Sequence, residues 1–284
     1  MRFRSLKRIF WKEEALLTVV LVVGITIAYY VLMNIVLPEL LNIGSPGYIF
    51  LRMLGLFLFS NIMSNMAMCM LVDPTVDPKQ LSLQFELRKQ RTDWHECRKC
   101  EILAPPRSYH CRICGVCILT RDHHCYFSAC CIGYENYRYF FYTVLYTFVA
   151  SFISFIASSI FWFVLHGGSY EFFETHLIWK EFVIPVARIE FICLYILMLV
   201  VLVVSAMELH TCWPNVRYGA TYFEANSRNF SYDQGMKSNL EMFFGQRMHL
   251  TWISAFIPSH LPHDGINWRK TDACKGDWAI QKTK

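Results

Sequence analysis

The chain has 284 residues, of which 55% are hydrophobic and 17% are charged, and its formal net charge is +5. Soluble domains carry about 45–50% apolar and about 25% charged residues, so the composition excludes an ordinary soluble globule, a disordered chain and a collagen-like chain. Its twelve cysteines are too few for a disulfide scaffold, which takes about 8–10%. Eight of them lie between Cys97 and Cys131, which predicts a membrane protein carrying one small metal-binding or redox module.

Four apolar runs are long enough to cross a bilayer, which takes about 20 residues. In chain order they are Ala15–Leu37, Tyr48–Leu71 with Arg52 near one end, Phe140–Leu165, and Phe191–Met207, which Phe182–Ile189 could extend if Arg188 lies at the interface. Buried core helices are the alternative, and these lengths disfavour them. We therefore predict an all-α polytopic membrane protein with four transmembrane helices and a small cytosolic zinc-bound domain between the second and third.

Lysine and arginine set the expected orientation, because cytosolic segments near span ends carry an excess of both. Five precede the first run, ten lie in residues 72–138 and nine follow Glu208, whereas residues 38–47 carry none and residues 166–190 carry two. We therefore expect both termini in the cytosol, and we attribute the positive charge to this bias rather than to nucleic-acid binding. The expected segments are a cytosolic N-terminus (1–14), transmembrane helices 1 and 2 (15–71), a cytosolic cysteine-rich domain (72–138), transmembrane helices 3 and 4 (139–207) and a cytosolic tail (208–284).

The cysteine-rich segment contains three overlapping Cys-x2-Cys steps with histidines among them. In a reducing cytosol, thiols in such patterns bind metal or act in catalysis more often than they form disulfides. Zn²⁺ takes four Cys or His ligands tetrahedrally, and the two-residue spacing lets both sulfurs reach one ion. Scattered buried thiols are the alternative. Twelve candidate ligands exceed the eight that two closed zinc sites need: Cys97, Cys100, Cys111, Cys114, Cys117, Cys125, Cys130, Cys131, His95, His110, His123 and His124.

This surplus of candidate ligands indicates a catalytic site, because a cysteine beside a histidine can act as a nucleophile with the histidine as its base. The contiguous Asp-His-His-Cys from Asp122 to Cys125 is the natural place for it. One histidine can bind zinc while the aspartate orients the other imidazole, as in catalytic triads. The spacing alone leaves open which residues are the surplus ones.

The sequence here resembles the DHHC-type protein S-acyltransferases, also called palmitoyltransferases, and the resemblance covers the whole order of spans, cysteine-rich domain and tail. Four motifs carry it in family order: Cys-x2-Cys from Cys97, Pro-x-Arg-x2-His-Cys-x2-Cys-x2-Cys from Pro105, Asp-His-His-Cys from Asp122, and Cys-Ile-Gly-x2-Asn-x3-Phe from Cys131. Weaker marks are Asp73-Pro74-Thr75, Thr221-Tyr222-Phe223-Glu224, and Tyr232-Asp233-Gln234-Gly235 with Asn239 after it.

The resemblance implies a role for each residue of the cysteine-rich domain. One structural Zn²⁺ would be held by Cys97, Cys100, His110 and Cys117, and the other by Cys111, Cys114, His124 and Cys131. Cys125 would be the acyl-accepting nucleophile, His123 its general base and Asp122 the group that orients His123. Arg107 would contact the phosphates of acyl-CoA, with Arg121 a weaker candidate; a solvated charge is the alternative for both.

The resemblance also implies the reaction. A long-chain acyl group, typically palmitoyl, would pass from acyl-CoA to Cys125 and then to cytosol-facing cysteines of membrane or membrane-associated proteins, at the endoplasmic reticulum or Golgi membrane. The alternatives are a catalytically weak zinc-bearing membrane scaffold that recruits partners, and a small transporter, which the lack of charged residues deep in the spans disfavours.

The chain departs from the family pattern next to the nucleophile. Family members usually continue with Pro-Trp and carry Asn before the last zinc cysteine, whereas this chain has Tyr126-Phe127 and Cys130. Tyr222 stands where the family has a threonine. One branch of the family lacks Pro-Trp and has a tail similar to Asp264-Gly265-Ile266, so we place this chain near that branch.

Overall fold

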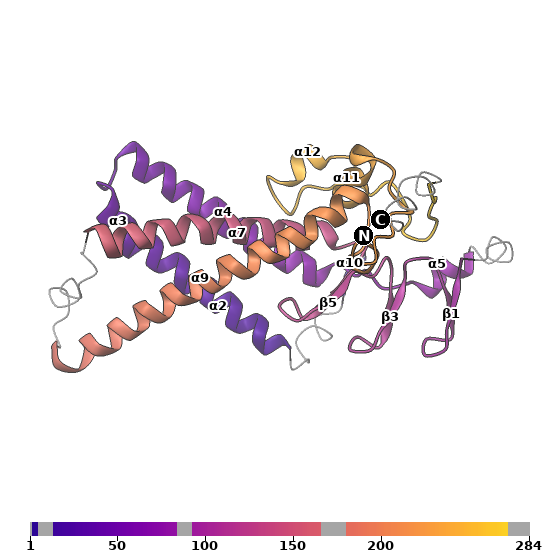
Figure 1. Cartoon of the computed structure of the whole chain (residues 1–284), viewed down its shortest axis with the longest axis horizontal. Coiled ribbons are helices and arrows are strands. Elements are labelled where there is room, and N and C mark those ends of the chain that lie inside the picture. The colour runs from indigo at the N-terminus through magenta and orange to yellow at the C-terminus, as the bar shows by residue number, and fades with distance from the viewer. Residues whose placement is uncertain (1, 5–13, 84–92, 166–179, 272–284) are drawn as a thin grey trace, which may run out of the picture. The chain divides into compact units, whose positions relative to one another are not determined.

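A computed structural model describes residues 2–4, 14–83, 93–165 and 180–271, and Figure 1 shows the elements that they form. The basic residues Lys7, Arg8 and Lys12 of the expected cytosolic N-terminus, and most of the expected loop 166–190, lie outside the described residues. The helices are α2 (Ala15–Val31), α3 (Leu37–Leu40), α4 (Pro46–Leu71), α5 (Pro78–Leu83), α7 (Tyr137–Ser159), α9 (Lys180–Tyr218), α10 (Tyr222–Asn226), α11 (Met236–Phe244) and α12 (Met248–Thr251). Two π-helical turns, Leu32–Val36 and Ile160–Leu165, continue α2 and α7.

Four of the described helical stretches are long and apolar enough to cross a membrane, so the prediction of four spans is confirmed. They are Ala15–Leu40, Pro46–Leu71, Tyr137–Leu165 and Ile192–Tyr218. The last one continues past Met207, where the apolar run of the sequence ends, to Tyr218. Gly219 follows with φ of 62°, a backbone conformation that suits glycine and ends a helix. The helix therefore carries polar residues beyond the membrane stretch.

The contacts between residues divide the chain into two compact units, each described by itself below. The membrane unit consists of Val19–Met63 and Thr143–Leu209, and the cysteine-rich unit consists of Met1–Thr18, Ser64–Tyr142 and His210–Lys284. Each unit is therefore assembled from segments that are far apart in the sequence.

The membrane unit has a core where the π-helical turn after α2 meets the turn after α7. Leu32, Met33, Val36, Leu37 and Phe161 form its buried cluster. Large apolar side chains elsewhere on these helices are exposed, as expected for helices that face lipid.

The single charged residue of the second span has its polar partners within the membrane unit. The Arg52 guanidinium donates to the Met33 carbonyl oxygen at 3.0 Å, to the Tyr48 hydroxyl at 2.7 Å and to Asn34 Oδ1 at 3.3 Å. These bonds offset the cost of placing a charge near the membrane, so Arg52 needs no role in transport.

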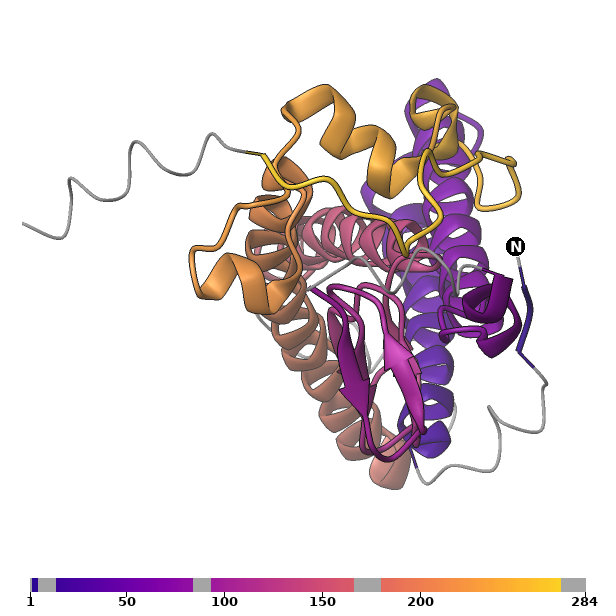
Figure 2. The same cartoon turned by 90° about the vertical axis from the view of Figure 1, so that its right-hand side faces the viewer.

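The cysteine-rich unit is built on three two-stranded antiparallel hairpins, which lie side by side in one row (Figures 1 and 2). They pair β1 (His95–Cys97) with β2 (Ile102–Ala104), β3 (Tyr109–Cys111) with β4 (Val116–Ile118), and β5 (His123–Cys125) with β6 (Cys130–Ile132). Each strand has three residues, too few to stabilise a sheet by burial. A segment of this kind needs another source of stability, such as bound metal.

The segment after α9 packs through a capped helix that begins at Tyr222. The Thr221 hydroxyl accepts from the Glu224 N–H at 3.3 Å, and Glu224 Oε2 accepts from the Thr221 N–H at 2.8 Å. This reciprocal pair is a capping box, which satisfies two backbone donors that the first turn of a helix leaves open. Residues 221–224 of the expected family motif therefore form a rigid helix start.

Candidate active site and zinc centres

The first group of metal-ligating side chains joins the first two hairpins. The ligand atoms of Cys97, Cys100, His110 and Cys117 all lie within 4.8 Å of one another. His110 Nδ1 is 3.8 Å from Cys97 Sγ and 3.2 Å from Cys100 Sγ, and His110 faces Cys117 across the β3–β4 ladder. Tetrahedral zinc with its usual bond lengths separates a sulfur from a nitrogen ligand by about 3.5 Å. The four donors thus fit one zinc ion.

The second group joins the second and third hairpins in the same way. Here the ligand atoms of Cys111, Cys114, His124 and Cys131 lie within 4.8 Å of one another. His124 Nδ1 is 3.6, 3.4 and 3.5 Å from the three sulfurs, and Cys114 Sγ is 3.6 Å from Cys131 Sγ. The structure therefore brings together the same eight residues, in the same two groups, that the family resemblance implies.

Glu14 supports the second group from the start of the first span. Its Oε2 accepts a hydrogen bond from His124 Nε2 at 2.9 Å, while His124 Nδ1 faces the three sulfurs. A carboxylate in this position fixes the orientation of a zinc-binding histidine and increases its basicity. The sequence carries no signal for this contact, because 110 residues separate the two partners.

Asp122, His123 and Cys125 lie outside both candidate metal groups. Successive side chains of a strand alternate between its faces, so His123 and Cys125 point to one side of β5 and His124 to the other. Asp122 Oδ2 is 2.8 Å from His123 Nδ1, which leaves the Nε2 nitrogen for the cysteine. The hairpin thus separates His124, the candidate metal ligand, from His123, the candidate base.

The structure surrounds Asp122 with donors on its second oxygen. Asp122 Oδ1 accepts from the Tyr222 backbone N–H at 2.6 Å and from Asn215 Nδ2 at 3.3 Å, and Asp122 is buried. Two fixed donors hold this carboxylate in place, with its other oxygen aimed at His123. Asn215 lies near the end of α9, and the sequence analysis did not find it.

His123 lies in a surrounding that favours the imidazolium form. Burial by itself lowers its pKa, but hydrogen bonding to Asp122 and Cys125 outweighs this and raises the pKa of His123 to about 10. The ring also packs edge-on against Phe140, with 4.9 Å between ring centroids. An imidazole held in this way readily takes a proton from a neighbouring thiol.

Comparison with known proteins decides the family of this chain. Residues 90–229 match the family model described as DHHC palmitoyltransferase. The chain is 33% identical over 187 residues to probable palmitoyltransferase ZDHHC24 of Danio rerio, and 30% identical over 217 residues to probable palmitoyltransferase ZDHHC24 of Rattus norvegicus.

The chain belongs to the DHHC palmitoyltransferase family. The match with the Danio rerio protein covers 63% of this chain and 62% of that protein, and the match with the Rattus norvegicus protein covers 74% of each. The family model spans both metal groups, the Asp122–Cys125 motif and the capped turn that contains Tyr222.

Tyr222 departs from the threonine of the family pattern at a position where the structure uses only the backbone. Its N–H donates to Asp122, whereas its side chain is 50% exposed. Any residue other than proline at this position can therefore preserve the contact that orients the Asp122 carboxylate.

Arg107 has partners that differ from the expected acyl-CoA phosphates. Its guanidinium donates to both carboxylate oxygens of Glu224, at 2.9 and 2.6 Å, and to the Gly219 carbonyl oxygen at 2.7 Å. Its carbon Cζ lies 4.5 Å from the Tyr232 ring centroid and 4.4 Å from that of Trp268. Arg107 is only 3% exposed, so its guanidinium is not free to meet a phosphate in this structure. Burial and bidentate pairing indicate instead that Arg107 joins the cysteine-rich segment to the tail.

The turn after Cys125 carries two exposed aromatic side chains. Tyr126 is 54% exposed and Phe127 is 45% exposed, and the Phe127 carbonyl oxygen accepts from the Thr18 hydroxyl at 2.9 Å. Two exposed aromatic side chains beside Cys125 provide an apolar surface without the Pro-Trp pair of the usual pattern.

Proposed function

We propose that this chain transfers a long-chain acyl group, typically palmitoyl, from acyl-CoA to cysteines of membrane or membrane-associated proteins. The observation that carries the proposal is the position of His123 and Cys125 on one face of a hairpin whose other face carries candidate metal ligands, with Asp122 just before the strand in contact with His123. Such a hairpin can hold a nucleophile and its base in fixed geometry. Family membership supports the same reaction.

In the first step, His123 accepts the proton of the Cys125 thiol, and the Asp122 carboxylate stabilises the imidazolium that forms. The Cys125 sulfur attacks the thioester carbon of acyl-CoA, and the bond from that carbon to the CoA sulfur breaks. The proton held by His123 passes to the departing CoA sulfur. The product is an S-acyl group on Cys125, as in other covalent catalysis.

In the second step, a cysteine of the protein substrate loses its proton to His123 and attacks the same carbonyl carbon. The bond to Cys125 breaks, and His123 returns the proton to the Cys125 sulfur. One thioester replaces another in each step, so the exchange is near neutral in energy and needs no nucleotide hydrolysis.

The two ligand groups would serve this reaction indirectly. Each offers four protein donors and therefore no position for a reactive water, which is the pattern of a structural zinc site. When bound, zinc would cross-link the three hairpins and so hold His123 and Cys125 in place. We further propose that the termini and the cysteine-rich unit face the cytosol, at the endoplasmic reticulum or Golgi membrane.

The test is to incubate the purified full chain in detergent with radiolabelled palmitoyl-CoA and to measure label that hydroxylamine releases. We expect the wild type to take up label and Cys125→Ser to take up none while it keeps its zinc. Cys193→Ser is the matched control, because Cys193 is exposed and lies in a span. A wild-type chain with full zinc content and no label would contradict the proposal and favour the scaffold.

A further inference from the structure

Cys130 lies directly opposite the nucleophile in the third hairpin. The β5–β6 register pairs Cys125 with Cys130 and His124 with Cys131. Because side chains alternate along each strand, Cys125 and Cys130 point to one face of the hairpin while the metal ligands His124 and Cys131 point to the other. The fold therefore places a second thiol on the face that carries the reaction.

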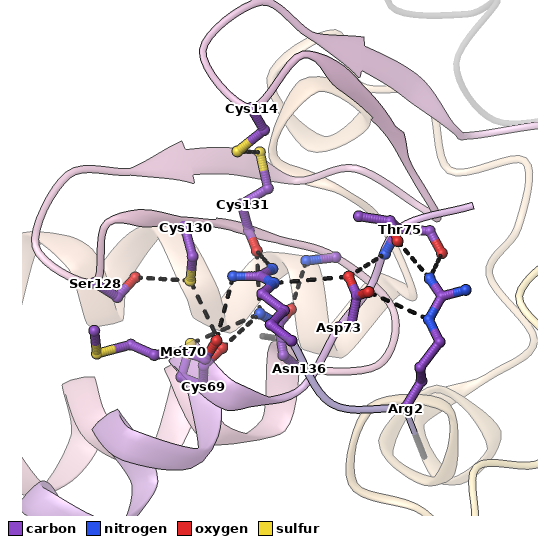
Figure 3. A network of polar contacts seen from close by, with 12 residues as sticks. Arg2, Cys69, Met70, Asp73, Thr75, Cys114, Ser128, Cys130, Cys131 and Asn136 are labelled. Carbon is purple, nitrogen blue, oxygen red and sulfur yellow. Dashed lines mark hydrogen bonds and ion pairs between the residues drawn. The ribbon is translucent and has the colours of Figure 1, made fainter. Parts of the chain in front are cut away.

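Cys130 belongs to neither ligand group in the part of the chain that the structure describes. Its sulfur lies 3.3 Å from Ser128 Oγ and 3.6 Å from the Cys69 carbonyl oxygen. Figure 3 shows this sulfur on the side of Cys69, away from the sulfur pair of Cys114 and Cys131. Cys130 is 1% exposed and Cys125 is 6% exposed, so both thiols are shielded from bulk solvent.

The separation of the two residues suits a covalent bond between them. Directly opposed residues of an antiparallel pair have Cα atoms about 4.5–5.5 Å apart. Disulfides span Cα separations of about 4.4–6.8 Å, a range that includes the separation expected for Cys125 and Cys130. The Cys130 sulfur would have to turn from its contacts with Ser128 and Cys69 toward Cys125.

We propose that Cys125 and Cys130 form a reversible disulfide under peroxide, which blocks the nucleophile and protects it from further oxidation. The bond can form whether or not the proposed function holds; that it stops acyl transfer rests on that function. A cysteine pair of this kind suits a reducing compartment, where disulfides are mostly transient and regulatory.

The chemistry proceeds in two balanced steps. Hydrogen peroxide oxidises the Cys125 thiol to a sulfenic acid, and one water leaves. The Cys130 sulfur then attacks the Cys125 sulfur, the S–O bond breaks, and the Cys130 proton leaves with the hydroxide as a second water. A small dithiol reverses the bond by thiol–disulfide exchange and is itself oxidised to its disulfide.

The test treats the full chain with hydrogen peroxide, alkylates the remaining thiols and digests it with chymotrypsin. Cleavage after Tyr126 or Phe127 puts the two cysteines on different peptides. We expect mass spectrometry to find these peptides joined through Cys125 and Cys130, with zinc content unchanged. Palmitoyl labelling should decrease as the fraction of chains with the Cys125–Cys130 disulfide increases, and it should recover after treatment with dithiothreitol.

Cys130→Ser is the decisive variant. If it does not fold, Cys130→Asn takes its place, because asparagine is the residue that the family usually carries here. We expect either variant to take label before peroxide. After peroxide treatment, Cys125 of the variant should be oxidised to the sulfinic acid, and dithiothreitol should not recover palmitoyl labelling because it cannot reduce that acid.

Two results would overturn the inference: sulfinic acid at Cys125 in wild type and variant alike, or a link between Cys130 and Cys69 instead. The mass readout is independent of acyl transfer. If wild type carries the Cys125–Cys130 link but never takes up label, the proposed function fails and the disulfide stands.

Discussion

At the scale of single residues, the orientation of His123 depends on a carboxylate whose two oxygens have separate tasks. Asp122 Oδ2 holds His123, while Oδ1 accepts from the Tyr222 N–H and from Asn215. A hydrogen bond to a charged group contributes about 1.5–3 kcal/mol, so either donor matters to the position of the base.

Tyr222→Pro tests the backbone donor, because proline removes one N–H and keeps the chain direction. Tyr222 is the first residue of α10, where proline is tolerated, and Thr221 before it is already extended, with φ of −86° and ψ of 164°. We expect acyl transfer to slow by about ten- to a hundredfold with zinc and thermal stability retained. Tyr222→Thr keeps the N–H and should transfer at nearly the wild-type rate; equal rates in both variants would contradict this role of the backbone.

Substitutions of Arg107 test whether this residue forms a structural ion pair or contacts a phosphate. Removing one partner of a buried ion pair costs about 3–5 kcal/mol. We therefore expect Arg107→Ala to lower the thermal unfolding temperature strongly, and Arg107→Lys to lower it less because lysine cannot form the bidentate pair with Glu224. If Arg107→Ala raised the KM for palmitoyl-CoA and left the unfolding temperature unchanged, the expected phosphate role would be restored.

At the scale of elements, the hairpins have strands of only three residues, and bound metal would supply the stability that a hydrophobic core supplies in larger domains. Cys111 and Cys114 come from the second hairpin, and His124 and Cys131 from the third. One ion at this group would tie two hairpins together. Loss of a ligand should therefore disorder more of the chain than loss of the nucleophile.

Glu14→Gln tests the carboxylate behind His124. The glutamine can still hydrogen bond but carries no charge, so we expect the affinity of the second group for zinc to fall by about ten- to a hundredfold. A titration with a zinc chelator measures this as earlier release of one of two ions. Glu96→Gln is the matched control, because Glu96 is exposed in β1 and should change neither release step. Simultaneous release of both ions would contradict a role confined to one group.

At the scale of the whole molecule, the proposed orientation in the membrane rests on the distribution of basic residues. Residues 38–47 between the first two spans carry no lysine or arginine, whereas residues 72–138 carry ten. We expect an Asn-X-Ser acceptor placed in residues 42–46 to be glycosylated in microsomes, and acceptors added at either terminus to remain unmodified. Glycosylation at a terminus would reverse the proposed topology.

Local sequence patterns predicted the four spans, which the structure confirms, and the family resemblance predicted the eight metal ligands together with Asp122, His123 and Cys125. Spans follow from local composition, because a membrane selects long apolar runs. The ligands and the motif follow from short spacings along the chain, which a family resemblance could assign residue by residue. The strands escaped prediction because three residues carry too little periodicity.

The residues that complete the site from distant parts of the chain became visible in the folded structure alone. Glu14 reaches His124 across 110 residues, and Asn215 reaches Asp122 across 93. It likewise placed Arg107 between Glu224 and two aromatic rings instead of at an open surface. The position of Arg107 in its motif does not reveal that the side chain is buried, because the residues that enclose it come from the tail, more than a hundred positions later. Side-chain contacts between distant segments form only when the chain folds, so no local pattern encodes them.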